Sequence, residues 1–114
     1  MNIPFSPPDI TEEEIEAVAE VMRSGWITTG PKTKELERKM AEFTHTNRGV
    51  CLNSATSCME MALRLFEIGP GDEVIVPAYT YTASASVVCH VGATLRLVDV
   101  EKGTFHIDYA AVES

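Results

Sequence analysis

Two short segments carry the residues best suited to binding a phosphorylated, planar ligand. The first is Asn53-Ser-Ala-Thr-Ser57, in which hydroxyls and small side chains precede an apolar stretch of helical composition. Unpaired N–H groups at a helix N-terminus bind phosphate, and small side chains let the phosphate approach the backbone. The segment therefore indicates either a phosphate site or only a helix cap, which Ser, Thr and Asn provide in many proteins.

The second segment, Pro77-Ala-Tyr-Thr-Tyr-Thr82, follows a predicted strand and carries two aromatic rings. An aromatic ring in such a loop either stacks on a planar heterocycle or packs into the protein core. The residues alone leave both roles open for Tyr79 and for Tyr81.

The other candidate chemistry, metal binding, has little support. The three histidines have no metal-ligand spacing with one another or with the cysteines, so we expect no metal site. The cysteines Cys51, Cys58 and Cys89 lie in apolar runs. Their odd number, in a chain without a signal segment, predicts reduced and buried thiols.

The charge and hydropathy patterns exclude two classes of partner. The net charge is -8 and the nine basic residues are scattered singly, so the chain lacks the basic stripe that binds nucleic acid. No run approaches the roughly 20 apolar residues of a membrane span, and the N-terminus has no signal-peptide pattern. We therefore expect a cytoplasmic protein that contacts neither nucleic acid nor membrane.

The N-terminal part predicts an extended arm followed by two helices that must support these segments. Three prolines keep the first ten residues extended. A capping box formed by Thr11 and Glu14 begins the first helix, and Ser24-Gly25 ends it. A second helix with one apolar face is predicted after Pro31.

From residue 49 the pattern becomes that of an α/β protein. Strands are predicted at 49–52, 73–77 and 93–98, and helices at 58–66 and 82–90. Alternating strands and helices form a parallel sheet, whose strand C-termini share one edge with the helix N-termini. Both candidate segments are predicted to lie at that edge.

The last residues indicate a part of a larger domain. Asp108 is a predicted cap, followed by barely one turn of helix up to Ser114. A single helical turn is not stable alone. Three parallel strands also need cover on both faces of the sheet. We therefore expect a fragment.

Four blocks of the sequence resemble the DegT/DnrJ/StrS family of sugar aminotransferases in their order and spacing. The blocks are Gly25-Trp-Ile-Thr-Thr-Gly-Pro31, Leu52-Asn-Ser-Ala-Thr56, Gly69-Pro-Gly-Asp-Glu-Val-Ile-Val-Pro77 and Val91-Gly-Ala-Thr-Leu-Arg-Leu-Val-Asp-Val100. The resemblance implies the N-terminal part of the large domain of a pyridoxal-phosphate (PLP) aminotransferase, an α/β fold with a mostly parallel sheet and flanking helices. It implies an arm, first helix and loop over residues 1–30, and an incomplete PLP-binding domain over residues 31–114.

The resemblance also implies which residues bind the cofactor. Ala55 and Thr56, next to Ser54, would hold the phosphate of PLP, in agreement with the helix N-terminus argument. Tyr81 would stack on the pyridine ring, a choice that the residues alone did not make.

Substrate binding and catalysis follow from the resemblance in the same way. Thr28 and Thr29 fall in a loop that would lie near the substrate. The lysine that forms the Schiff base with PLP is expected beyond Ser114, so no catalytic residue is assigned and the 114 residues alone are expected to be inactive.

The activity implied by the resemblance is transfer of an amino group, commonly from glutamate, to a nucleotide-linked keto sugar by a homodimer. Two alternatives stay open. One is a PLP-dependent sugar dehydratase of the same family, in which a histidine replaces the lysine. The other is a stand-alone α/β module that binds a phosphorylated small molecule through a helix N-terminus.

Overall fold

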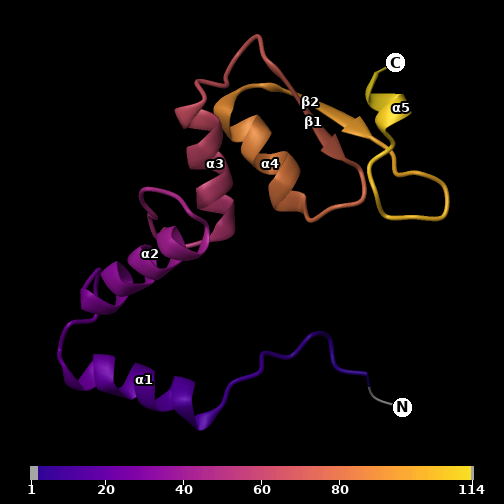
Figure 1. Cartoon of the computed structure of the whole chain (residues 1–114). Coiled ribbons are helices and arrows are strands. Elements are labelled where there is room, and N and C mark those ends of the chain that lie inside the picture. The colour runs from indigo at the N-terminus through magenta and orange to yellow at the C-terminus, as the bar shows by residue number, and fades with distance from the viewer. Residues whose placement is uncertain (1–2, 114) are drawn as a thin grey trace. The chain divides into compact units, whose positions relative to one another are not determined.

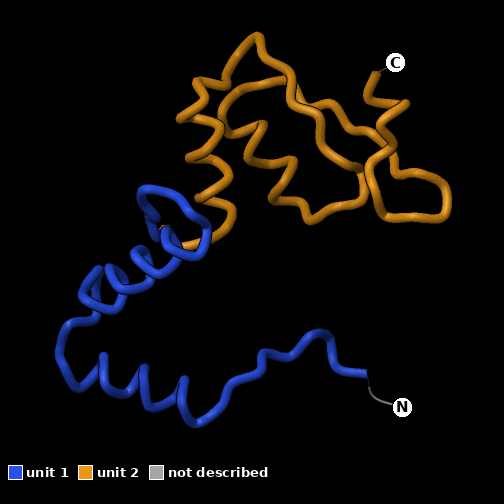
Figure 2. The backbone as a smooth tube through the Cα atoms, in the orientation of Figure 1, with its two compact units in different colours: residues 1–51 blue, residues 52–114 orange. Residues whose placement is uncertain are grey.

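The computed structural model describes residues 3–113, which form two compact units, one ending at Cys51 and the other beginning at Leu52 (Figure 2). The N-terminal unit is helical, and the C-terminal unit is α/β. The boundary predicted between residues 30 and 31 refers to the domains of a whole enzyme and stays a prediction.

The N-terminal unit consists of an arm followed by α1 (Glu12–Arg23) and α2 (Pro31–Phe43) (Figure 1). Residues 3–10 form neither helix nor strand, as predicted. The predicted capping box begins α1, where the Thr11 N–H donates to Glu14 Oε2 at 2.6 Å. The hydrogen bonds from Thr11 lower the pKa of Glu14 below its ordinary value.

Both helices of this unit expose apolar side chains in the described chain. Val18 and Met22 of α1 are 60% and 67% exposed, and Phe43 of α2 is 80% exposed. Apolar faces of this kind are typical of surfaces that pack against further protein.

The strand predicted at 49–52 is wrong, because these residues form neither strand nor helix. Within the N-terminal unit this segment bonds to α2 instead of to a strand. The Cys51 N–H donates to Glu37 Oε1 at 2.9 Å, and a side chain at Gly49 would come within 2.7 Å of the Glu37 carbonyl oxygen. A strand requires a neighbouring strand for its backbone groups, and residues 3–113 provide none at this position.

The C-terminal unit contains a two-stranded parallel sheet and three helices. Its elements are α3 (Ala55–Leu65), β1 (Glu73–Pro77), α4 (Thr82–Val91), β2 (Thr94–Val98) and α5 (Tyr109–Val112). The pairing runs from Glu73 opposite Thr94 to Pro77 opposite Val98. The predicted α/β class and the predicted parallel pairing of these two strands are confirmed.

The core of this unit is built around α4, which lies between α3 and the sheet (Figure 1). Val76 of β1 and the α4 residues Val87, Val88 and Val91 are buried, and Val88 is only 1% exposed. By contrast, α3 has no buried residue. α4 is therefore the firmly anchored helix of the pair.

α3 begins earlier than predicted, at Ala55 instead of Cys58. Ser54 Oγ accepts a hydrogen bond from the Ser57 N–H at 3.1 Å, so residues 55–57, which were expected to precede the helix, are already its first turn. The short helix expected after Asp108 is confirmed as α5, and the Asp108 side chain caps it.

The burial predicted for the cysteines is wrong, because Cys58 and Cys89 are exposed and Cys51 is half-buried. An apolar run in a helix also places members on the outward side, since side chains follow a 3.6-residue period. All three are free thiols. Among the described helices, none has the length and apolar character needed to cross a bilayer.

Candidate functional site

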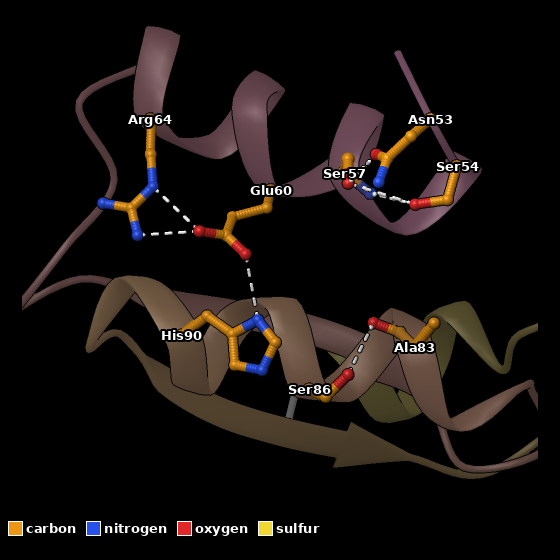
Figure 3. Close-up of polar contacts among 8 residues, drawn as sticks. All are labelled: Asn53, Ser54, Ser57, Glu60, Arg64, Ala83, Ser86 and His90. Carbon is orange, nitrogen blue, oxygen red and sulfur yellow. Dashed lines mark hydrogen bonds and ion pairs between the residues drawn. The ribbon is translucent and has the colours of Figure 1, made fainter.

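A small network of hydrogen-bonded polar side chains lies at the N-terminus of α3 (Figure 3). Ser54 Oγ accepts from the Ser57 N–H, and Ser57 Oγ donates to Asn53 Oδ1 at 2.7 Å. Within residues 3–113, the N–H groups of Ala55 and Thr56 have no hydrogen-bond partner. These two donors point out of the helix end and are available to a ligand.

The electrostatics of this helix end come from the backbone alone. Residues 53–57 carry no ionisable side chain. The partial positive charge of a helix N-terminus attracts an anion without a basic side chain nearby. The arrangement therefore suits a phosphate group, and the small Ala55 side chain leaves room for its approach.

The two tyrosines of the loop after β1 differ in their surroundings. The Tyr79 ring stacks on Phe105, with ring centroids 5.0 Å apart and an angle of 23° between the ring planes. Tyr81 precedes α4, makes no side-chain capping bond and is 81% exposed. Among the described residues its ring has no aromatic partner, so its faces are available for stacking.

α3 and α4 pack side by side with their N-termini at the same end (Figures 1 and 3). In the close-up, Asn53 and Ser54 lie at the end of α3 that faces the Ala83 end of α4. The open N–H groups of Ala55 and Thr56 are therefore carried at the same end of the unit as the residue that starts α4.

The loop between α1 and α2 borders a separate cavity within the N-terminal unit. This cavity has a volume of about 490 Å³, and Thr28 and Trp26 line it. The Thr29 carbonyl accepts a hydrogen bond from Trp26 Nε1 at 3.0 Å. The indole lies against Gly30, where an added Cβ would come within 2.6 Å of Nε1. Thr28 therefore faces a hollow large enough for a small ligand.

Sequence reasoning missed the polar link between α3 and α4. Glu60 Oε2 lies 3.0 Å from His90 Nδ1, and Arg64 donates to the other Glu60 oxygen at 2.7 and 3.0 Å (Figure 3). The hydrogen bonds from Arg64 and His90 lower the pKa of Glu60. A signal existed, since Asn53, Ser57, Glu60 and Arg64 follow helical spacing and form one polar stripe.

Metal-binding chemistry has no cluster to support it in the part of the chain that the structure describes. No group of three or more His, Cys, Asp or Glu side chains comes together there as a metal site would require. At the N-terminus of α3, the polar groups that converge are neutral hydroxyls, an amide and backbone N–H donors.

The chain matches the family model described as the DegT/DnrJ/EryC1/StrS aminotransferase family over residues 8–114. It is also similar to a solved Streptococcus pneumoniae protein, Spr1654, described as a sugar aminotransferase. The identity is 64% and the TM-score 0.90, over 99% of this chain and 28% of the other in the apo form. That protein was also solved in PMP and PLP forms, with the same identity and TM-score.

Two further solved structures agree with this match at lower identity. S. venezuelae DesV, in complex with a ketimine intermediate, is 38% identical with a TM-score of 0.80, over 90% of this chain and 28% of that chain. An aminotransferase from Psychrobacter cryohalolentis is 34% identical with a TM-score of 0.85, over 96% and 29%. The chain thus spans between a quarter and a third of the length of these structures. It belongs to the DegT/DnrJ/EryC1/StrS aminotransferase family.

Proposed function

We propose that this chain supplies the phosphate site and the ring-stacking tyrosine of a PLP-dependent sugar aminotransferase. The family is PLP-dependent. The observation that carries the proposal is the pair of open N–H groups at Ala55 and Thr56, carried at the same end of the C-terminal unit as the exposed Tyr81.

The residues present fit the cofactor. A phosphate needs several donors, and the first turn of α3 offers two backbone N–H groups, with the hydroxyls of Ser54 and Thr56 beside them. A pyridine ring needs a flat, exposed partner, which the Tyr81 ring provides. The cap formed by Ser54 holds the helix end in shape without occupying the two donors.

Each part of this site has a distinct task. Ala55 and Thr56 bind the phosphate and so anchor the cofactor. Tyr81 orients the ring by stacking and excludes water from one of its faces. When bound, PLP supplies the electron sink that the amino-group transfer requires.

The proposal extends to the substrate, the assembly and the compartment. Thr28 contacts a keto sugar linked to a nucleotide, with Thr29 beside it, and glutamate is the amino donor. The protein works in the cytoplasm as a homodimer, which the exposed apolar side chains of α1 and α2 support. The lysine that attaches PLP lies beyond Ser114 in the full-length enzyme.

A proline substitution at Ala55 tests the phosphate site. Ala55 is the first helical residue and Ser54 before it is extended, so proline fits the backbone and removes only the N–H. In the full-length chain, we expect Ala55→Pro to weaken binding of pyridoxamine phosphate about tenfold or more. Calorimetry or fluorescence titration measures the affinity.

The control is Glu12→Pro, the same change at the first helical position of α1, which should leave the affinity unchanged. Tyr81→Ala should weaken binding roughly threefold to tenfold, whereas Tyr81→Phe should bind normally because the ring remains. Unchanged affinity in both Ala55→Pro and Tyr81→Ala would exclude this site. A stand-alone phosphate module would respond to Ala55→Pro but not to Tyr81→Ala.

A further inference from the structure

We propose that Glu60 and His90 are positioning residues, which fix α3 against α4 and so set the separation between the phosphate site at Ala55 and the ring-stacking Tyr81. The proposal rests on the proposed function of these two groups. Neither Glu60 nor His90 lies in the predicted site, and both act through the helices that carry it (Figure 3).

The geometry of Glu60 is that of a prearranged contact. Arg64, one turn further along α3, donates through Nε and Nη2 to Oε1 at 3.0 and 2.7 Å. These two hydrogen bonds orient the carboxylate. Its other oxygen, Oε2, forms a hydrogen bond with His90 Nδ1 on α4 at 3.0 Å. A carboxylate already held by one partner loses less side-chain freedom when it bonds to a second.

This contact has no substitute between the two helices. In the described chain, it is the one side-chain hydrogen bond that joins α3 to α4. The facing surface of α4 carries small side chains, including Ala83 and Ser86, and Ser86 Oγ bonds back to the Ala83 carbonyl at 3.3 Å within α4 (Figure 3). Small residues allow a close approach but do not fix the helices along their axes.

The two helices also differ in how they are anchored. α4 is held to the sheet by Val87, Val88 and Val91, whereas α3 contributes no buried side chain. The position of α3 therefore depends on its contact with α4. Since α3 carries the open N–H groups and α4 follows Tyr81 directly, a shift of α3 changes the distance between the two halves of the site.

If Glu60 and His90 act in this way, their loss should weaken the binding of a ligand that contacts both halves of the site and leave unchanged the binding of a ligand that contacts one half. Pyridoxamine phosphate contacts both halves, so its affinity depends on their separation. Inorganic phosphate contacts only the end of α3, so its affinity does not. A residue that merely keeps α3 folded would affect both ligands equally.

The test measures both affinities for the full-length chain and its His90→Ala variant. We expect a roughly threefold to fivefold loss for pyridoxamine phosphate, the size that a partly exposed hydrogen bond allows, and no change for inorganic phosphate measured by competition. His90→Asn should restore most of the affinity, because its amide nitrogen stands where Nδ1 stood and can still donate to Glu60. His106→Ala is the matched control, and its binding should be normal.

A double-mutant cycle tests whether Glu60 and His90 act on the affinity through their contact with each other. If Glu60 and His90 act as a pair, Glu60→Ala with His90→Ala binds pyridoxamine phosphate as weakly as either single variant and no more weakly. Additive losses, an equal loss for inorganic phosphate, or no loss at all would overturn the proposal. Failure of the proposed function itself is distinguished by normal binding in Ala55→Pro and Tyr81→Ala.

Discussion

Gly30, like Gly49, is a residue of the N-terminal unit at which a side chain would collide with its surroundings. The Trp26 indole lies where a Cβ would stand, and its Nε1 donates to the Thr29 carbonyl. The tight loop between α1 and α2 thus depends on one missing methyl group. Trp26 and Gly30 also line the cavity that Thr28 lines, so their contact shapes this cavity.

Gly30→Ala should displace this indole. An added Cβ would lie 2.6 Å from Trp26 Nε1, too close for any ordinary contact, so the indole must shift, and we expect its hydrogen bond to the Thr29 carbonyl to be lost. Trp26 is the single tryptophan of the 114 residues, and its fluorescence should become more accessible to iodide. Gly69→Ala, where the nearest atom is 3.6 Å away, is the control. Equal quenching in all three proteins would contradict the prediction.

Single residues also show where sequence reasoning stopped. It could not tell that the Tyr79 ring has an aromatic partner, because this depends on Phe105, which is distant in sequence and stacks on Tyr79. It missed the contact between Glu60 and His90 for the same reason, although helical spacing places Glu60 on a polar stripe of α3. Contacts between remote residues are decided by packing, which no local pattern records.

At the scale of elements, local signals were sufficient where the backbone hydrogen bonds of the predicted element found partners, in a helix cap or in a neighbouring strand. The capping box of α1, the cap of α5, and the apolar runs of β1 and β2 each predicted the observed element. The strand at 49–52 failed because a strand needs a neighbour, which an apolar run cannot guarantee. α3 began early because hydroxyls that suit a turn also suit a helix cap.

Gly92 ends α4 and should be sensitive to substitution. Its φ of 81° is left-handed, and an added Cβ would lie 3.2 Å from Pro70 Cγ. We expect Gly92→Ala to reduce the free energy of unfolding by roughly 1–2 kcal/mol, measured by urea denaturation. Gly92→Asn should lose less, because asparagine tolerates this conformation better. An equal loss in both would indicate that the contact with Pro70 dominates.

At the scale of the whole molecule, the carboxylates link stability to pH. The pKa values of Glu14, Glu35 and Glu60 are all lowered, mainly by hydrogen bonds from Thr11, Lys39 and Arg64 respectively. A carboxylate with a lower pKa in the folded protein stabilises the fold above its unfolded pKa. That contribution is lost as the pH falls through the folded pKa.

The free energy of unfolding should therefore decrease as the pH falls below about 4.5, the ordinary pKa of a glutamate side chain. Glu14→Gln should make the fall shallower and lower the stability at neutral pH, because it removes the carboxylate that Thr11 holds. Urea denaturation at several pH values measures both effects. Glu13→Gln is the control, since this carboxylate makes no hydrogen bond within residues 3–113. Identical pH profiles for the two variants would refute the assignment.

The packing of α4 against β1 and β2 also gives the C-terminal unit an uneven resistance to local opening. These three elements follow one another along the chain, β1 and α4 supply the buried valines, and β2 pairs with β1, so we expect the three to open together as one cooperative block. α3, without a buried side chain, can detach at a smaller free-energy cost. A ligand bound at the end of α3, as we propose, would therefore also stabilise the more weakly anchored helix of the proposed site, and part of its binding energy would be used to hold that helix in place.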